Sequence, residues 1–242
     1  MRLDFSHERV LAVVAHPDDA DCLSAGTLAR AKADGAEIGI CVLCKGDKGQ
    51  PDPPIANLGA VRKREMAAAA KLLGAGLLWA GFGDGQLADT PVQRKKLIEL
   101  FRRFRPTLVL AHSAEDYHAD HRAASSLAEA ASWFSTSAGH KTQSAAMTTQ
   151  PALWWMDTVN MSGFQPEFYV DVSDYVEVKR RMLACHKSQL RRGHHPQDGP
   201  GGDFSPLEEQ MLRQLRARGA QADVAAAEAF RSHHAWKRLR AW

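Results

Sequence analysis

Residues 9–21 have the sequence RVLAVVAHPDDAD, a short apolar run that passes directly into one histidine and three aspartates. An apolar run without polar alternation is typical of a strand that is buried on both faces of a parallel sheet. Pro17 and the aspartates are also common in turns and helix caps, so this stretch alone is explained equally well by a turn. Its position at the carboxyl end of a predicted strand nevertheless makes it a candidate site.

The same strand-helix unit recurs along the chain. Apolar runs at residues 9–15, 37–44, 77–81 and 107–111 alternate with helical patterns at residues 22–34, 57–73, 91–104 and 119–134. This alternation predicts a doubly wound α/β fold, with a mostly parallel sheet and helices on both faces. Two further strands are expected at residues 152–156 and 168–172, and a helix at residues 174–190.

Boundary residues agree with this assignment. Thr90 and Gln93 form a capping box with Pro91 at the first helical position, and Gly74 is a helix stop. Neither of the common glycine-rich nucleotide-binding motifs is present, so the chemistry at the strand ends is of another kind.

Length and composition indicate one globular domain over residues 1–242, since 45% of the residues are hydrophobic and 24% are charged. Three segments have compositions typical of loops, either functional lids or plain surface. They are residues 45–55, 135–150 and 191–206.

Charge and hydropathy limit the partners. The net charge is only +3 and the basic residues form short separate clusters, which argues against nucleic-acid binding. The early apolar run at residues 10–15 is too short for a signal peptide or a membrane span, so we expect a cytoplasmic protein. Cys41 and Cys44 lie inside an apolar run, where small core residues are expected rather than a redox pair. The tryptophans predict core positions or the interface of a homo-oligomer.

A second polar cluster follows the fourth predicted strand, where residues 111–121 have the sequence AHSAEDYHADH. In the common strand order 3-2-1-4-5, the first and fourth strands are neighbours, and their carboxyl ends meet at one edge of the sheet. His16 and Asp19, completed by a histidine of the second cluster, would supply two imidazoles and one carboxylate. Such a set suits a catalytic Zn²⁺, because three protein ligands leave one position for water.

These residues resemble a known family. AHPDD at residues 15–19 and HADH at residues 118–121 are similar to the two main motifs of the PIG-L/LmbE-like N-acetylglucosaminyl deacetylases. Further matches lie at residues 46–49, Arg62, Glu65, residues 84–85, residues 186–189 and residues 228–230. The resemblance implies a Rossmann-like, LmbE-like fold and covers residues 9–190 well.

The family pattern implies a role for each motif residue. His16, Asp19 and His121 would bind the metal. Asp18 would be the general base. His118 would stabilise the oxyanion or act as an acid, and Asp120 would orient His118.

Other positions carry weaker expectations. Arg62 resembles a substrate-binding arginine of the family. Glu65 is expected either to pair with Arg62 or Arg64 or to reach the pocket, His112 to be part of the strand end, and His186 to be packed in the helix.

The resemblance thus implies hydrolysis of the acetamide of an N-acetylglucosamine-type substrate, with zinc or another divalent ion. Asp21, Ala25 and Ala119 depart from the usual family residues, which puts the substrate preference in doubt rather than the chemistry. Two alternatives remain at this point, a metal-dependent phosphoesterase and a non-catalytic metal- or sugar-binding module.

Overall fold

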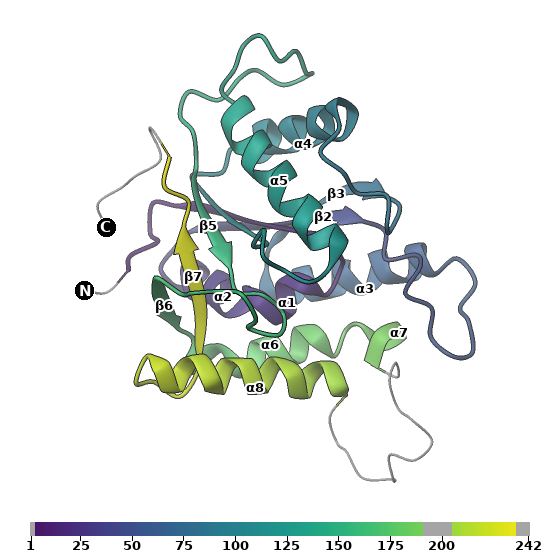
Figure 1. Cartoon of the computed structure of the whole chain (residues 1–242), viewed down its shortest axis with the longest axis vertical. Coiled ribbons are helices and arrows are strands. Elements are labelled where there is room, and N and C mark those ends of the chain that lie inside the picture. Colours follow the sequence, from purple (N-terminus) through teal and green to yellow (C-terminus); the bar gives the residue numbers. More distant parts are fainter. Residues whose placement is uncertain (1–2, 191–204, 236–242) are drawn as a thin grey trace.

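The computed structural model describes residues 3–190 and 205–235, and their strands form one seven-stranded sheet (Figure 1). Its strand order is β3-β2-β1-β4-β5-β7-β6. The strands are β1 (Arg9–Val14), β2 (Glu37–Cys44), β3 (Gly76–Phe82), β4 (Leu108–Ala111), β5 (Ala152–Met156), β6 (Phe168–Asp171) and β7 (Ala227–Ser232). Strands β1 to β5 are parallel, whereas β7 runs antiparallel to both β5 and β6. The predicted fold class is confirmed, and β1 and β4 are neighbours as expected.

Helices cover both faces of the sheet because both faces of its strands are apolar. In β1, Val10, Ala12 and Val14 belong to one core cluster, whereas Leu11 and Val13 belong to the other. Helices α4 and α5 lie over one face, and α2, α3, α6 and α8 over the other (Figure 1). The helices are α1 (Asp19–Leu23), α2 (Ala25–Ala33), α3 (Leu58–Leu73), α4 (Pro91–Phe104), α5 (Ala119–Phe134), the 3₁₀ turn η1 (Ser173–Tyr175), α6 (Val176–Leu183), α7 (Lys187–Leu190) and α8 (Pro206–Gln221).

The single helix predicted at residues 22–34 is wrong in its boundaries. The helical segment already begins at Asp19, and it breaks at Ser24 into α1 and α2. The break is stabilised from outside, because the buried Glu228 carboxylate accepts hydrogen bonds from the backbone N–H groups of Gly26 (3.0 Å) and Thr27 (2.7 Å). A partner 202 residues away explains why the local pattern did not reveal the break.

The C-terminal part also differs from the prediction. Residues 174–190 form η1, α6 and α7 rather than one helix, and neither α8 nor β7 was predicted. Ser205 caps α8 by accepting from the Glu208 N–H group, with Pro206 at the start, so a start signal was present in the sequence. Strand β7 contains two alanines and no β-branched residue, so its composition gave little indication of a strand.

The three irregular segments lie at different places. Residues 45–55 follow β2 at the carboxyl edge of the parallel strands. Residues 135–150 connect the end of α5 to the start of β5, so they lie at the opposite edge, at the top of Figure 1. Of the two roles left open for this second segment, its position therefore agrees with plain surface rather than with a lid over the site. The third segment, residues 191–206, falls mostly outside the described residues.

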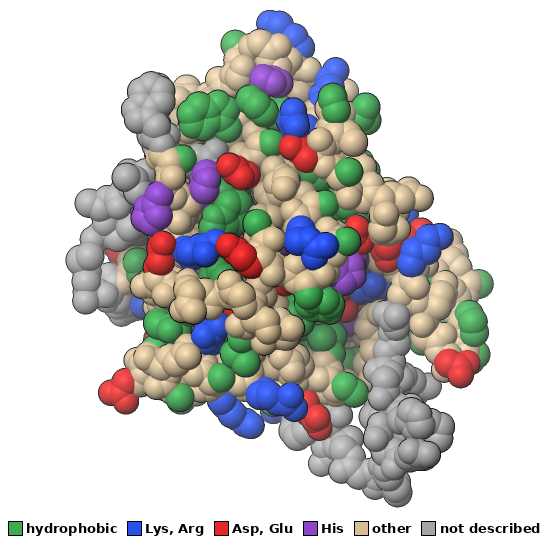
Figure 2. Space-filling view, viewed as in Figure 1, with side chains coloured by type: hydrophobic (Ala, Val, Ile, Leu, Met, Phe, Trp, Pro, Cys, Tyr) green, Lys and Arg blue, Asp and Glu red, His purple; other side chains and the backbone are tan. Residues whose placement is uncertain are grey.

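The predicted burial of Cys41, Cys44, Trp154 and Trp155 is confirmed, because all four side chains are buried in the sheet. On the face shown in Figure 2, acidic and basic side chains are interspersed. In the described part of the chain, no helix combines the length and the apolar character that a bilayer span requires.

Candidate active site

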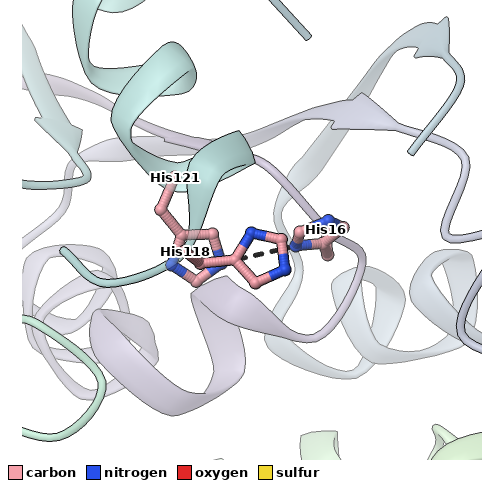
Figure 3. A group of neighbouring side chains, drawn as sticks. All are labelled: His16, His118 and His121. Carbon is pink, nitrogen blue, oxygen red and sulfur yellow. Dashed lines mark hydrogen bonds between the residues drawn. The ribbon is translucent and has the colours of Figure 1, made fainter. Parts of the chain in front are cut away.

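The two polar clusters meet at the carboxyl edge of the sheet. The β1–β4 register pairs Val13 with Ala111, so both strands end side by side. His16 lies in the loop after β1, and His118 and His121 come from the cap and first turn of α5 (Figure 3). The convergence inferred from the strand order is therefore present.

His16, Asp19 and His121 place their donor atoms at nearly equal separations. His16 Nδ1 lies 3.3 Å from His121 Nε2 and 3.5 Å from Asp19 Oδ2. His121 Nε2 lies 3.4 Å from Asp19 Oδ1. Two imidazole nitrogens and one carboxylate thus face a common point.

Each of these histidines has a carboxylate on its second nitrogen. His16 Nε2 lies 3.1 Å from Asp120 Oδ2, and His121 Nδ1 lies 3.1 Å from Asp116 Oδ1. A carboxylate in this position fixes the tautomer and the ring orientation of a metal-binding histidine. Asp116 lies in the second strand-end cluster, but its spacing along the chain did not indicate this role.

The expected role of Asp120 needs a correction. Its carboxylate contacts His16 and accepts from the Gly85 N–H group (2.9 Å), rather than orienting His118. His118 contacts the Asp120 backbone instead, because its Nδ1 accepts from that N–H group (3.2 Å) and caps α5. His118 is therefore held by the helix end, and Asp120 holds His16.

The electrostatics of the cluster favour bound positive charge. Burial lowers the pKa of His16, but hydrogen bonds to Asp120 and Asp19 outweigh it and raise the pKa to about 10. Burial likewise lowers the pKa of His121, but Asp19 and Asp116 raise it to about 9. Burial raises the pKa of Asp19, whereas the His121 charge and the bonds from the histidines hold it well below its usual value.

His112 lies closer to the centre of this cluster than expected, since the sequence predicted only a structural role for it at the strand end. It is fully buried, and its Nε2 lies 3.1 Å from Asp19 Oδ2. Its ring stacks on His121 at a centroid distance of 4.0 Å. Burial and the charge of His121 lower the pKa of His112 to about 4, so the ring is neutral near pH 7. His112 thus packs behind two of the converging groups.

Asp18 lines the same cleft as this cluster and pairs with a residue outside the cluster. Its Oδ1 forms a 2.8 Å ion pair with Arg62 Nη2, and its side chain is 15% exposed. Arg62 is buried and also approaches the Gly46 carbonyl oxygen (3.4 Å). A fixed cation therefore holds the Asp18 carboxylate at the cleft surface, and part of the Arg62 guanidinium is already occupied.

The family motif at residues 186–189 lies beside the same cleft. Ser188 donates to Glu65 through its N–H group (2.8 Å) and its hydroxyl (2.6 Å), so the expected arginine partners of Glu65 are wrong. Gln189 donates to the Gly49 carbonyl oxygen (3.2 Å). His186 is fully buried, with Nε2 3.4 Å from Asp21 Oδ1, which agrees with its expected packing.

Together these groups surround a cleft of about 540 Å³. The residues that line it are His16, Asp18, Asp19, Cys22, Leu23, Lys48, Gly49, Arg62, Asp84, Gly85, Tyr117, His118, Asp120, His121, Val159, Gln189 and Leu207. Figure 2 shows histidine side chains in a recess between hydrophobic and charged side chains. The metal-binding, catalytic and substrate-binding residues expected from the family pattern all line this one cleft.

Comparison with known proteins supports a family assignment. Residues 11–132 match the family model described as PIG-L, GlcNAc-PI de-N-acetylase. A diacetylchitobiose deacetylase from Thermococcus kodakarensis is 29% identical over 193 residues, which are 76% of this chain and 70% of that protein. A conserved protein from Thermus thermophilus has a crystal structure with TM-score 0.79 and 31% identity, covering 96% of this chain and 100% of that one.

The fold also occurs with another chemistry. A 4-carboxy-2-hydroxymuconate hydratase from Pseudomonas putida gives TM-score 0.79 at 22% identity, covering 94% of this chain and 97% of that chain. At this identity the likeness concerns the fold alone. The family match covers both polar clusters and the strands that carry them. The chain belongs to the PIG-L family of deacetylases and is an enzyme of the α/β fold class that its sequence predicted.

Proposed function

We propose that the protein hydrolyses the acetamide of an N-acetylglucosamine-type substrate, with one divalent ion held by His16, Asp19 and His121. The proposal depends on three distances: His16 Nδ1 lies 3.3 Å from His121 Nε2, and these two nitrogens lie 3.5 Å and 3.4 Å from the Oδ2 and Oδ1 atoms of the Asp19 carboxylate, respectively. Ligands that bind one tetrahedral ion at roughly 2.0–2.1 Å are themselves about 3.3–3.4 Å apart. The residues therefore fit an ion at their common point with little movement.

The type of donor favours zinc. Two imidazole nitrogens and one carboxylate suit Zn²⁺ and related transition ions better than Mg²⁺ or Ca²⁺, which prefer oxygen ligands. The two carboxylates that contact the other nitrogen of each histidine support the same assignment. Asp120 keeps Nδ1 of His16 directed at the common point, and Asp116 does the same for Nε2 of His121.

When bound, such an ion supplies Lewis acidity to water and to the acetyl carbonyl group. Asp18 lies next to a ligand, and its ion pair with Arg62 orients its carboxylate on the cleft surface. We assign Asp18 as the base that takes a proton from the attacking water. His118 faces the same cleft and stabilises the negative charge that develops on the acetyl oxygen.

The leaving amine needs a proton. Asp18 can return the one it has taken, and His118 is the second candidate donor. Both groups line the cleft, so this assignment keeps two alternatives. The products are acetate and a free amino sugar.

A metal-dependent phosphoesterase is the alternative function. Phosphoesterases that use two ions need a second set of ligands. In the described residues, each group of neighbouring side chains that could hold an ion contains His16 or His121, so each shares at least one residue with the proposed set. This overlap favours a site for one ion.

Acetate release tests the proposal directly. The protein loaded with Zn²⁺ is incubated with N-acetylglucosamine, diacetylchitobiose, and N-acetylglucosamine linked to inositol, and acetate and primary amine are quantified. Equal amounts of acetate and amine are expected, with no phosphate released from an aryl phosphate. The His121→Ala variant is the control and should lose both zinc and activity. Phosphate release, or turnover that does not depend on His121, would contradict the proposal.

A further inference from the structure

A buried ion pair lies behind the segment that carries Asp18 and Asp19. Lys179 of α6 donates to the carboxylate of Glu228 in β7, and the two side chains are 0% and 3% exposed. Neither residue lines the cleft, so neither has a part in the reaction steps proposed above. A buried ion pair is rarely more stable than apolar residues of the same size, so its other hydrogen bonds indicate what the pair does.

Each charge bonds to one side of the break between α1 and α2. Lys179 Nζ donates to the Cys22 carbonyl oxygen (3.1 Å), in the last turn of α1. The Glu228 carboxylate accepts from the N–H groups of Gly26 and Thr27, in the first turn of α2. A helix carries partial negative charge at its last carbonyl groups and partial positive charge at its first N–H groups. The cation and the anion therefore each lie at the helix end of opposite sign.

The ion pair takes the place of a backbone hydrogen bond. In a continuous helix the Gly26 N–H group would donate to the Cys22 carbonyl oxygen, four residues earlier. Here that N–H group donates to Glu228 (3.0 Å), that carbonyl accepts from Lys179 (3.1 Å), and the two side chains contact each other. Glycine at position 26 allows this close approach, since a Cβ atom there would lie 2.7 Å from Val172 Cβ and 3.0 Å from Glu228 Oε1. The pair thus bridges the break in the helix.

Helix α1 carries the reacting residues at its other end. It has five residues, Asp19 is the first of them, and Asp18 is its N-cap. A helix this short is not stable on its own, so its position is set by its tertiary contacts. Helix α6 packs against both α1 and α2 (Figure 1). Asp19 and Cys22 lie within one helical turn, so a shift of Cys22 would move the two aspartates with it.

We propose that Lys179 and Glu228 are positioning residues for the reaction. Their ion pair holds α1 at the break, so that the Asp19 carboxylate faces His16 and the Asp18 carboxylate faces the cleft. Both act through the backbone of residues 22–27 rather than by touching the metal or the substrate. This inference rests on the proposed function, because it assigns the pair a purpose within the same site.

A double variant removes the bridge without leaving an unpaired buried charge. Lys179→Met combined with Glu228→Gln eliminates both charges, so its Tm should stay closer to that of the parent than the Tm of Lys179→Met alone. Glu228→Gln alone keeps the size of the side chain and one acceptor oxygen, and it is the milder variant should the double variant not fold. Stability and positioning are thereby measured separately.

The site should respond to the loss of the bridge. Zinc binding by the double variant, measured by competition with a chelator, should weaken roughly 10- to 100-fold. At saturating zinc, kcat for acetate release should fall roughly tenfold or more, because the base and the ligand are displaced. KM should change less than about twofold, since no residue that lines the cleft is replaced. Glu228→Gln should show smaller losses of the same kind.

Arg102→Met is the matched control. Arg102 is likewise a buried cation that donates to backbone carbonyl oxygens, but these belong to Ser135 and Ser137, at the opposite edge of the sheet. This variant should lower Tm and keep the zinc affinity and kcat of the parent. All proteins are compared at a temperature at which circular dichroism shows each of them folded. The positioning role is overturned if the folded double variant binds zinc and turns over substrate like the parent, or if Arg102→Met shows the same losses.

Hydrogen exchange tests the bridge without metal or substrate. In the metal-free proteins, the amides of residues 18–27 should exchange roughly tenfold faster or more in the double variant than in the parent, whereas Arg102→Met should leave this segment unchanged. Equal exchange in the parent and the double variant overturns the inference. Faster exchange together with weaker zinc binding supports it even if the parent deacetylates no substrate, in which case the proposed function alone fails. A parent that binds no zinc would contradict both.

Discussion

Asp18 and Asp19 are adjacent and chemically identical, but the fold gives them different surroundings. Asp19 is buried among His16, His112 and His121, whereas Asp18 is paired with Arg62 at the cleft surface. Asp18→Asn should therefore keep its zinc and lose kcat by roughly 10²–10⁴-fold, because a general base is removed without loss of size. Asp19→Asn should lower zinc affinity instead, as measured by competition with a chelator.

The two variants check each other. Metal content and kcat are measured on the same preparations, and circular dichroism verifies that both variants fold. If Asp18→Asn loses its metal while Asp19→Asn keeps it, the two assignments must be exchanged. If Asp18→Asn turns over substrate at the parent rate, another group is the base.

At the scale of elements, the two loop segments in the described chain should respond differently to shortening. Residues 45–55 contribute Lys48 and Gly49 to the cleft, whereas residues 135–150 lie at the far edge of the sheet. Replacing residues 48–54 with a short Gly-Ser linker should raise KM several-fold and leave the zinc content unchanged, since no proposed ligand is removed.

The far loop should affect stability rather than catalysis. The buried Arg102 donates to the backbone carbonyl oxygens of Ser135 (3.0 Å), Ser137 (2.7 Å) and His140 (2.8 Å). Deleting residues 138–143 removes the His140 carbonyl and the Thr142 hydroxyl, both of which accept from Arg102 Nη1 (2.8 Å each), and should lower Tm, because a buried charged donor loses partners. KM should not change. A change of KM for this variant would mean that the loop acts on the cleft after all.

At the scale of the whole molecule, the cluster should make stability depend on both pH and metal. The folded-state pKa values of His16 and His121 are raised to about 10 and about 9, from an ordinary value of 6.5. Their contribution to the stability of the metal-free protein is fully present below pH 6.5 and is lost as the pH rises toward 9–10. The pKa of His112 is lowered to about 4, so this residue contributes in the opposite direction: it makes the folded state less stable as the pH falls from 6.5 toward 4.

Bound metal opposes this loss of stability at alkaline pH, because an ion takes the place of the protons on His16 and His121. We expect the Tm of the protein in chelator to fall from pH 6.5 to pH 9.5, and the increase in Tm on adding zinc to grow over the same range. Thermal unfolding at several pH values measures both quantities, and His16→Gln should reduce both slopes. A metal-free Tm that does not change with pH would contradict the raised pKa values.

The layers of the fold and the position of the site could be predicted from local patterns in the sequence. Apolar runs, helix caps and glycine stops act over a few residues, so the strands β1 to β4 and their helices could be located without a structure. The meeting of the two clusters followed from the strand order of doubly wound sheets, and the structure confirms it. The main ligand candidates could therefore be named from the chain alone.

The pairing of each carboxylate with its histidine could not be predicted from local patterns and follows from the three-dimensional packing. Asp116 and Asp120 both lie within five residues of His121, but one contacts His121 and the other contacts His16. The orientation of each histidine ring determines which carboxylate it contacts, and the spacing of the residues along the chain does not encode that orientation. Likewise, Glu65 contacts Ser188 across 123 residues, and Glu228 accepts from the Gly26 N–H group, 202 residues earlier, beside the break between α1 and α2. Such contacts arise from long-range packing, whereas the signals that a single sequence displays are short-range.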